Sequence, residues 1–317
     1  MTTRLLITSR TFGLGAPEVV QRLRDAGADV VSGVTDKTLS EEQLLAIIGD
    51  TEVLLAGTEP VTARVIAAAP RLRAIVRHGV GYDNVDLAAA KARGIPVGAA
   101  VGAISESVAD MTLGLILALA RHIPQTNAAV RAGAWPRIIG FELPGKTLGI
   151  VGLGAIGKAV CRRASGFGMH VIAYDPYPDH AFAQANGVAF VTLEELLARA
   201  DVITLHALVT DQTRGMINAR TLSLMKRTAY LINTGRGELV DETALLGALR
   251  AQTIAGAACD VFVKEPPVGS ELLTLENFIA TPHSSGMTVE GQQRMAAITV
   301  ENVLRVLRNE PPMHRVA

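Results

Sequence analysis

A chain of 317 residues, 49% of them hydrophobic, has enough apolar material for two domains, the usual number at this length. Its 30 Lys and Arg residues balance 30 Asp and Glu residues, so no overall charge attracts nucleic acid or an acidic membrane surface. The longest apolar run, MTLGLILALA, is too short to span a bilayer, and the first residues lack the apolar region of a signal peptide.

The two cysteines also limit the function classes. Cys161 and Cys259 lie in apolar surroundings and are expected to be core residues in a reducing compartment. They predict neither a disulfide nor a metal pair, and we predict no metal site. These properties indicate a cytoplasmic protein that acts on a small molecule, with neither nucleic acid nor a membrane as partner.

The first hundred residues alternate short apolar runs with amphipathic segments. Such an alternation predicts a parallel sheet with helices on both faces. Strands are expected at 4–9, 51–57, 72–79 and 95–100, and helices at 17–27, 62–70 and 86–94.

The stretch SESVADMTLGLILALARHIP, at 105–124, predicts one long helix. Ser105 is a suitable cap at its start, and Pro124 lies just beyond its expected end. A helix of this length can connect two domains.

A second alternation begins near Lys146. Thr192 and Glu195 form a capping box at the start of one of its helices. Strands are expected at 147–154, 170–175, 188–191, 201–206, 229–234, 254–262 and 277–282. The last amphipathic helix, 291–312, is expected to return to the first domain. The predicted fold class is α/β, with two doubly wound parallel-sheet domains, the second inserted in the first.

The segment GIVGLGAIGKAV has the spacing G-x-G-x-x-G at Gly152, Gly154 and Gly157, between a predicted strand and a predicted helix. The first glycine permits a tight turn, the second lets the backbone approach a pyrophosphate, and the third allows the helix to pack closely. The helix N-terminus, with Ala155 and Ile156 in its first turn, favours an anion. The pattern predicts a dinucleotide site.

Asp175 ends the next predicted strand, 175 − 152 = 23 residues after Gly152. A carboxylate there accepts hydrogen bonds from the adenosine ribose hydroxyls and repels a 2′-phosphate, by on the order of 4 kcal/mol at about 4 Å. Pro176 and Tyr177 follow where an arginine would accommodate that phosphate, so NAD is favoured over NADP. The alternative is that the glycines only pack a helix on a sheet.

Polar residues follow three predicted strands of the second domain. Arg236 lies in LINTGRGELVDE, Glu265 follows Asp260 in CDVFVKEPP, and His283 lies in IATPHSSG. Ligands of doubly wound sheets bind at the carboxyl ends of the strands, so these side chains are expected at one edge. Each alone has an ordinary explanation as a solvated, turn or surface residue. Their coincidence at one edge favours a functional site.

These residue types suit the reduction of a 2-keto acid, which needs a hydride from a nicotinamide and a proton on the carbonyl oxygen. His283 can supply the proton because histidine titrates near neutral pH. A carboxylate beside it would favour the protonated imidazole. Arg236 offers a rigid fork of donors for the substrate's carboxylate and carbonyl oxygen.

The segments GKTLGIVGLGAIG, YDPY, INTGRGELVDETALL, CDVFVKEPP and TPHSSGMT resemble, in order and spacing, those of the NAD-dependent D-2-hydroxyacid dehydrogenase family, and within it most closely the D-3-phosphoglycerate dehydrogenases. The resemblance extends from about Arg77 to the last predicted helix. It implies a Rossmann NAD-binding domain at 100–286, inserted in a flavodoxin-like substrate-binding domain at 1–99 and 287–317. It also implies a homodimer formed through the nucleotide-binding domain.

The resemblance assigns roles to residues. His283 is implied to be the acid/base, Glu265 to pair with it, and Arg236 to orient the substrate. The candidates for binding the substrate carboxylate, in RHGVGYDNVD, are Arg77, Val80 and Gly81. The residues implied to bind NAD are Gly152, Gly154, Ala155, Ile156, Gly157, Asp175, His206, Thr210, Thr234 and Asp260, the last at the nicotinamide carboxamide.

The chain departs from the family pattern in two places. The segment HALVT keeps His206 and Thr210 but has Leu208 where the family usually has proline, so the backbone of this loop is expected to differ. The sequence ends at Ala317, without the C-terminal regulatory domains of many phosphoglycerate dehydrogenases. Serine feedback through such a domain is therefore not expected.

Two other functions fit the sequence less well than the enzyme does. A non-catalytic NAD(H)-sensing protein, like the transcriptional co-repressors that resemble this family, is disfavoured by the lack of basic patches and disordered tails. Formate dehydrogenase activity is also disfavoured, because that relative has glutamine where this chain has Glu265. The substrate stays open among glyoxylate, hydroxypyruvate, pyruvate-like acids and 3-phosphohydroxypyruvate. A phosphorylated acid would need extra cations, for which Arg64, Arg73 and Arg77 are available.

Overall fold

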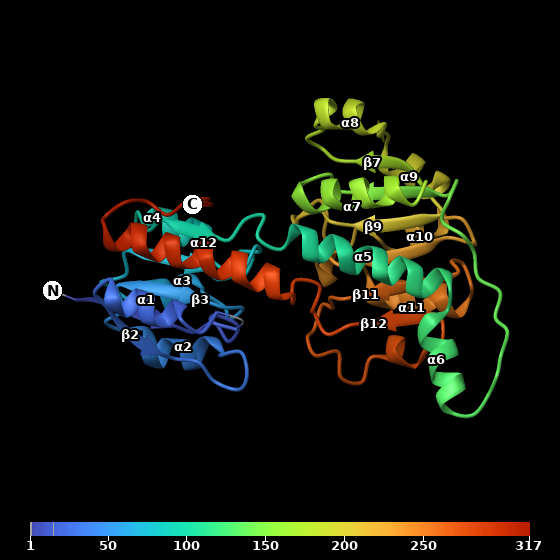
Figure 1. Cartoon of the computed structure of the whole chain (residues 1–317). Coiled ribbons are helices and arrows are strands. Elements are labelled where there is room, and N and C mark those ends of the chain that lie inside the picture. The colour runs from blue at the N-terminus through green and yellow to red at the C-terminus, as the bar shows by residue number, and fades with distance from the viewer. Residues whose placement is uncertain (1, 15) are drawn as a thin grey trace. The chain divides into compact units, whose positions relative to one another are not determined.

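The computed structural model of the protein describes residues 2–14 and 16–317 (Figure 1). The chain divides into two compact units. Unit 1 consists of Met1–Ile104 and Met287–Ala317, and unit 2 of Ser105–Gly286. Each unit is built on a sheet in which every pair of neighbouring strands is parallel. The expected α/β fold with two parallel sheets is thereby confirmed.

Unit 1, in its described residues, has a five-stranded sheet in the order β2-β1-β3-β4-β5, which is the flavodoxin-like order. Its strands are β1 (Thr3–Ile7), β2 (Ala28–Ser32), β3 (Val53–Ala56), β4 (Ala74–Arg77) and β5 (Val97–Ala99). Its helices are α1 (Val19–Asp25), α2 (Glu41–Ile48), α3 (Ala63–Ala67), α4 (Leu87–Ala92) and α12 (Val289–Leu307). The last helix packs on α1 and β4, so the C-terminal segment completes the core of this unit.

The sequence patterns missed two elements of unit 1. Strand β2 forms one edge of the sheet, and only Ala28 in it is fully buried, so its apolar signal is weak. Helix α2 has eight residues and starts with a capping box in which Ser40 and Gln43 exchange hydrogen bonds. A capping box is readable from sequence, and here it was overlooked.

Unit 2 has a seven-stranded sheet in the order β12-β11-β10-β9-β6-β7-β8, and all its residues are described. This is the Rossmann order with one further strand. The strands are β6 (Thr147–Val151), β7 (His170–Tyr174), β8 (Ala189–Phe190), β9 (Val202–Leu205), β10 (Tyr230–Asn233), β11 (Gly256–Cys259) and β12 (Phe278–Ala280). The helices are α5 (Ser105–Ala120), α6 (Ile123–Arg131), α7 (Ala155–Gly166), α8 (His180–Asn186), α9 (Leu193–Arg199), α10 (Ala219–Ser223) and α11 (Glu242–Arg250), with short 3-10 turns at Gly237–Leu239 and Glu271–Thr274.

The sheet of unit 2 has an apolar core on each face. Helices α5 and α7 pack on one face, and α9, α10 and α11 on the other. Neighbouring residues of one strand enter opposite cores, as Leu231 and Ile232 of β10 do. Strands buried on both faces therefore read as continuous apolar runs. This property explains why the sequence predicted the central strands β6, β9, β10 and β11, whereas the edge strand β8, which is partly exposed, was found only from the short apolar run VAFV.

The long helix expected at 105–124 is wrong at its C-terminal end. Helix α5 ends at Ala120, and His122, with φ 50°, begins a second helix, α6. Pro124 lies in the first turn of α6, where its missing N–H costs nothing. Within the described residues, no helix is both long and apolar enough to cross a membrane.

Candidate active site

The glycine-rich turn connects β6 to α7 and has no room for a side chain at two of its three glycines. Gly152 has φ 93°, and a Cβ there would lie 2.7 Å from the Ala207 nitrogen. A Cβ on Gly157 would lie 2.2 Å from the Gly152 oxygen. A Cβ on Gly154 would instead meet nothing within 4 Å, and no side chain caps the start of α7. The turn thus leaves open space in front of a helix N-terminus, which suits a pyrophosphate.

Asp175 follows β7 beside this turn. Its Oδ2 accepts a hydrogen bond of 2.8 Å from the Leu153 N–H, and its Oδ1 accepts one of 2.8 Å from the Tyr177 N–H. A carboxylate can accept about four hydrogen bonds, so two further acceptor positions are left for ribose hydroxyls. The glycines and Asp175 together fit the adenosine half of NAD.

Replacing Asp175 by asparagine is expected to relax the discrimination between NADH and NADPH. The amide oxygen can still accept from the Leu153 N–H, but the charge that repels a 2′-phosphate is lost. We expect the ratio of kcat/KM for NADPH to that for NADH to rise by about 100-fold. This rise is smaller than the full repulsion between two charges in contact would give, because solvent at the site screens the charge. Steady-state kinetics with both cofactors measures this ratio. The same change at exposed Asp36 should leave it unaltered.

The loop after β9 carries His206, Leu208 and Thr210. The His206 Nε2 lies 2.9 Å from the Thr204 hydroxyl, and burial lowers the pKa of His206 to about 3, so the ring is neutral. The Thr210 hydroxyl pairs with Thr213, whose hydroxyl donates to the Leu208 oxygen at 2.6 Å. Hydrogen bonds of Thr213 thus hold the loop although Leu208 replaces the usual proline. The Leu208 side chain is exposed.

Arg236 lies in a loop after β10 that is closed by hydrogen bonds between its own residues. The Asn233 amide donates to the Arg236 oxygen at 2.8 Å and accepts from the Gly235 N–H at 3.1 Å. A Cβ on Gly237 would lie 2.1 Å from the carbonyl carbon of Phe262, so this loop touches the backbone that follows β11. Buried Thr234, just before the loop, lies 3.1 Å from the Thr112 hydroxyl of α5.

His283 and Glu265 form a pair. The His283 Nδ1 lies 2.8 Å from the Glu265 Oε2, and Glu265 Oε1 accepts from the Phe262 N–H. Burial acts to raise the pKa of Glu265, but the hydrogen bond and charge of His283 outweigh it, so this pKa lies below its usual value. Glu265 is therefore a carboxylate at neutral pH. Pairing through Nδ1 leaves the imidazole Nε2 for a substrate.

Asp260 holds the loop that carries His283. Its Oδ1 accepts from the Thr281 hydroxyl and the Ser284 N–H, and its Oδ2 from the N–H and hydroxyl of Ser285, all within 2.9 Å. Its main-chain oxygen accepts from the His283 N–H at 2.8 Å. These bonds fill about the capacity of the buried carboxylate. This positioning role was not predicted from the sequence, although the hydroxyl-rich segment TPHSSG is the signal that could have indicated it.

The unit 1 candidates lie at the end of β4. Arg77 is buried, and its guanidinium donates to Asn84 at 3.1 Å and to the His78 oxygen at 2.6 Å. Val80 and Gly81 follow in a half-buried loop. His78 is buried against Thr299 of α12, and burial, with the Arg77 charge, lowers its pKa to about 3. His78 is therefore a neutral core histidine.

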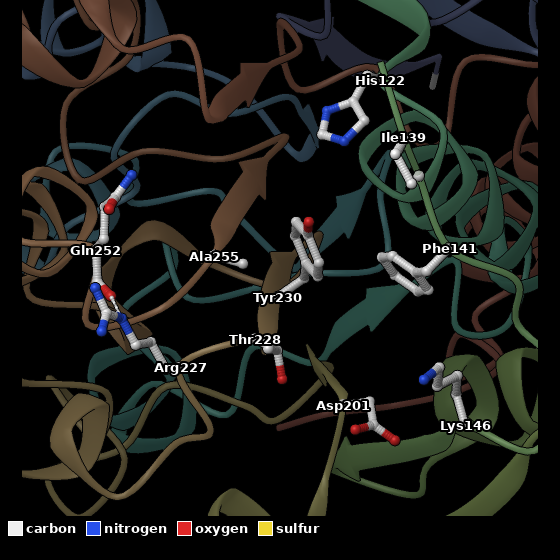
Figure 2. Close-up of a pocket in the computed structure, with 11 residues that line it drawn as sticks. His122, Ile139, Phe141, Lys146, Asp201, Arg227, Thr228, Tyr230, Gln252 and Ala255 are labelled. Carbon is white, nitrogen blue, oxygen red and sulfur yellow. Dashed lines mark hydrogen bonds between the residues drawn. The ribbon is translucent and has the colours of Figure 1, made fainter. Parts of the chain in front are cut away.

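A pocket of about 620 Å³ lies at the opposite edge of the unit 2 sheet (Figure 2). Its lining includes residues that precede or start strands, namely Lys146 before β6, Asp201 before β9 and Tyr230 in β10. Arg236, Glu265 and His283 all follow strands. The pocket is therefore separate from the candidate active site. Among the described residues, no group of His, Cys, Asp or Glu could hold a metal ion.

Comparison with known proteins gives consistent matches. The sequence profile described as D-isomer specific 2-hydroxyacid dehydrogenase, NAD binding domain, matches residues 113–285. The chain is 45% identical over 299 residues to D-3-phosphoglycerate dehydrogenase of Methanocaldococcus jannaschii, covering 92% of this chain and 56% of that protein. It is 41% identical over 285 residues to glyoxylate reductase of Korarchaeum cryptofilum, covering 87% and 86%. The chain thus spans about half the length of the phosphoglycerate dehydrogenase.

Solved structures agree. The TT0316 protein from Thermus thermophilus matches with a TM-score of 0.91 and 38% identity, over 99% of this chain and 100% of that one. D-Lactate dehydrogenase from Aquifex aeolicus, complexed with NAD and lactic acid, matches with a TM-score of 0.87 and 28% identity, over 97% of this chain and 96% of that one.

Proposed function

The chain belongs to the D-isomer specific 2-hydroxyacid dehydrogenase family, and on this premise we propose that it transfers a hydride reversibly between NAD and a D-2-hydroxy acid or its 2-keto acid. The observation that carries the proposal is the 2.8 Å pair of His283 and Glu265, held by Asp260 beyond the same sheet whose glycine-rich turn suits NAD. A bare nucleotide-binding fold has no need for such a pair.

In this proposal His283 is the acid that donates a proton from Nε2 to the keto oxygen. Glu265 accepts from Nδ1, fixes the ring orientation and compensates the imidazolium charge. Arg236 binds the carboxylate and the carbonyl oxygen of the substrate. Bound NADH would supply the hydride for the keto carbon. Arg77, Val80 and Gly81 are the proposed partners of the substrate carboxylate in unit 1.

The cofactor contacts follow the same order along the chain. The pyrophosphate is proposed to bind the backbone of Gly152, Gly154, Ala155, Ile156 and Gly157, and the ribose to bind Asp175. His206, Thr210 and Thr234 are proposed to line the remainder of the cofactor site. Because Asp260 already accepts about as many hydrogen bonds as it can, its proposed contact with the carboxamide would share these donors.

The test is the oxidation of NADH, followed by absorbance at 340 nm, with glyoxylate, hydroxypyruvate, pyruvate and 3-phosphohydroxypyruvate. We expect turnover with at least one acid, and much less with NADPH. Tight NADH binding with no turnover on any of them would instead support the non-catalytic, NAD(H)-sensing alternative.

We also propose that the protein is a cytoplasmic homodimer. The segment between α6 and β6 carries Trp135, 79% exposed, and Ile139, 92% exposed, and exposed apolar side chains grouped in one segment are typical of an interaction surface. Replacing Ile139 by glutamate is expected to shift the mass measured by light scattering from dimer to monomer. The same change at exposed Val34 should leave the dimer intact. A wild-type protein that is monomeric at micromolar concentration would contradict this.

A further inference from the structure

The sheet of unit 1 changes direction between β1 and β3. In the order β2-β1-β3-β4-β5 the chain leaves β1 toward one side and β3 toward the other. Ligands of such sheets bind beyond the carboxyl ends of the strands at this switch point. The residues there are Thr8 and Ser9 after β1, and the segment 57–59 after β3.

A carboxylate is buried at this position. Glu59 is 2% exposed, and its Oε1 accepts from the Gly57 N–H at 2.8 Å and from the Thr8 hydroxyl. No described residue donates a hydrogen bond to Oε2. Oε2 is not one of the buried side-chain atoms that lack a partner, so it reaches solvent and can accept a hydrogen bond from a ligand.

The surrounding loop is built to hold this carboxylate. The Asn84 amide donates to the main-chain oxygens of Gly57 and Glu59, at 3.1 and 2.7 Å, and its oxygen accepts from Arg77. A Cβ on Gly57 would lie 2.8 Å from the Glu59 Oε2 and 2.9 Å from the Ser9 Cα. Glycine at 57 is therefore what allows Glu59 to fold back over the strand ends.

The charges at the switch point oppose a phosphate. Arg10, on the loop after β1, is exposed, so its charge is screened by water, whereas the charge of buried Glu59 acts in a lower dielectric. Of the three arginines that could have served a phosphorylated substrate, Arg77 is proposed to bind the substrate carboxylate, and the other two are engaged elsewhere. Arg64 pairs with Glu41 at 2.8 Å, and Arg73 donates to Thr3 and to the Val306 oxygen.

We propose that Oε2 of Glu59 accepts a hydrogen bond from a hydroxyl group on the substrate. Unit 1 then selects a small 2-keto acid with an uncharged hydroxyl next to the keto group and rejects the phosphate ester of the same acid. Hydroxypyruvate is the simplest acid of this class. The inference rests on the proposed dehydrogenase function, and it makes Glu59 a specificity-determining residue.

The test compares kcat/KM for hydroxypyruvate, 3-phosphohydroxypyruvate and glyoxylate, which has no third carbon. Wild-type protein is expected to prefer hydroxypyruvate to its phosphate ester by about 100-fold. Glu59→Gln removes the charge, so this preference should fall at least tenfold. It also replaces the accepting oxygen by an amide, so kcat/KM for hydroxypyruvate should fall about tenfold relative to kcat/KM for glyoxylate. Glu59→Asp withdraws the oxygen but keeps the charge. This variant should lower kcat/KM for hydroxypyruvate relative to that for glyoxylate, while kcat/KM for the phosphate ester stays low.

Glu42→Gln, the same charge change on an exposed side chain of α2, is the matched control and should alter none of the ratios. Two results would overturn the proposal while leaving the dehydrogenase function intact. One is wild-type turnover of the phosphate ester equal to that of hydroxypyruvate. The other is unchanged ratios in both Glu59 variants, with glyoxylate still reduced. A wild-type protein that reduces none of the three acids refutes the dehydrogenase function, and the Glu59 proposal with it.

Discussion

Replacing His283 by alanine is expected to lower kcat by about 10²–10⁴-fold, the usual contribution of a positioned acid/base. The reason is geometric: His283 is the imidazole whose Nδ1 is paired with a carboxylate beyond β12, which leaves Nε2 to deliver a proton. Initial rates of NADH oxidation with a saturating keto acid measure the loss. NADH binding, followed by fluorescence, should change little, because the glycine-rich turn and Asp175 do not involve this ring.

His170→Ala is the matched control, because His170 is exposed at the start of β7, at the opposite edge of the sheet. It should keep wild-type kcat. Turnover of the His283→Ala protein within a few-fold of wild type, on a substrate that the wild type reduces well, would refute the role of His283 as the acid.

Glu265 is expected to affect turnover through its contact with His283. Its lowered pKa keeps it charged at and above neutral pH, where it stabilises the imidazolium. The hydrogen bond to Phe262 N–H anchors the other carboxylate oxygen, so the pair does not depend on His283 alone to orient Glu265. The backbone of His283, with φ 52°, is in the left-handed region. Its N–H bonds to the Asp260 and Thr281 oxygens hold it there.

The sequence predicted the fold best where strands are buried on both faces. The central strands of unit 2, β6, β9, β10 and β11, were found because each is buried and reads as an apolar run. The glycine spacing further identified the turn before α7. Strand β2 was missed because it is a partly exposed edge strand, and the break between α5 and α6 because a proline after an apolar helix looks the same whether it ends that helix or starts the next.

The candidate site, too, was only partly predictable from the sequence. Chemistry that depends on residue type, such as histidine, glutamate and arginine after strands, was visible in the sequence. Contacts that depend on tertiary packing were not. Nothing local indicates that Asp260 collects donors from Thr281, Ser284 and Ser285, or that Gly57 makes room for a buried Glu59. Such partners are more than twenty residues apart, or depend on the absence of a Cβ, and only the folded chain brings them together.

Arg236 is expected to be the second largest contributor to turnover. The backbone of its loop is fixed by two contacts. The Asn233 amide donates to the Arg236 oxygen, and Gly237 lies against the backbone of Phe262. The Phe262 N–H also donates to Glu265. The loops that carry Arg236 and Glu265, the partner of His283, are therefore in close backbone contact within unit 2. The backbone that carries the guanidinium fork is thus fixed, and the Nη1 of Arg236 donates to the Gly235 oxygen at 2.9 Å.

Replacing Arg236 by alanine is expected to lower kcat/KM by about 10²–10⁴-fold, since each charged hydrogen bond contributes about 1.5–3 kcal/mol. Arg236→Lys keeps the charge but not the fork, so it should recover only part of this loss, mainly through KM. Arg250→Ala, which removes an exposed arginine paired with Glu271, is the control and should be neutral. If lysine restored full kcat/KM, the charge at 236 would suffice and the bidentate role would be wrong. If alanine itself were tolerated, substrate orientation would have to come from other residues.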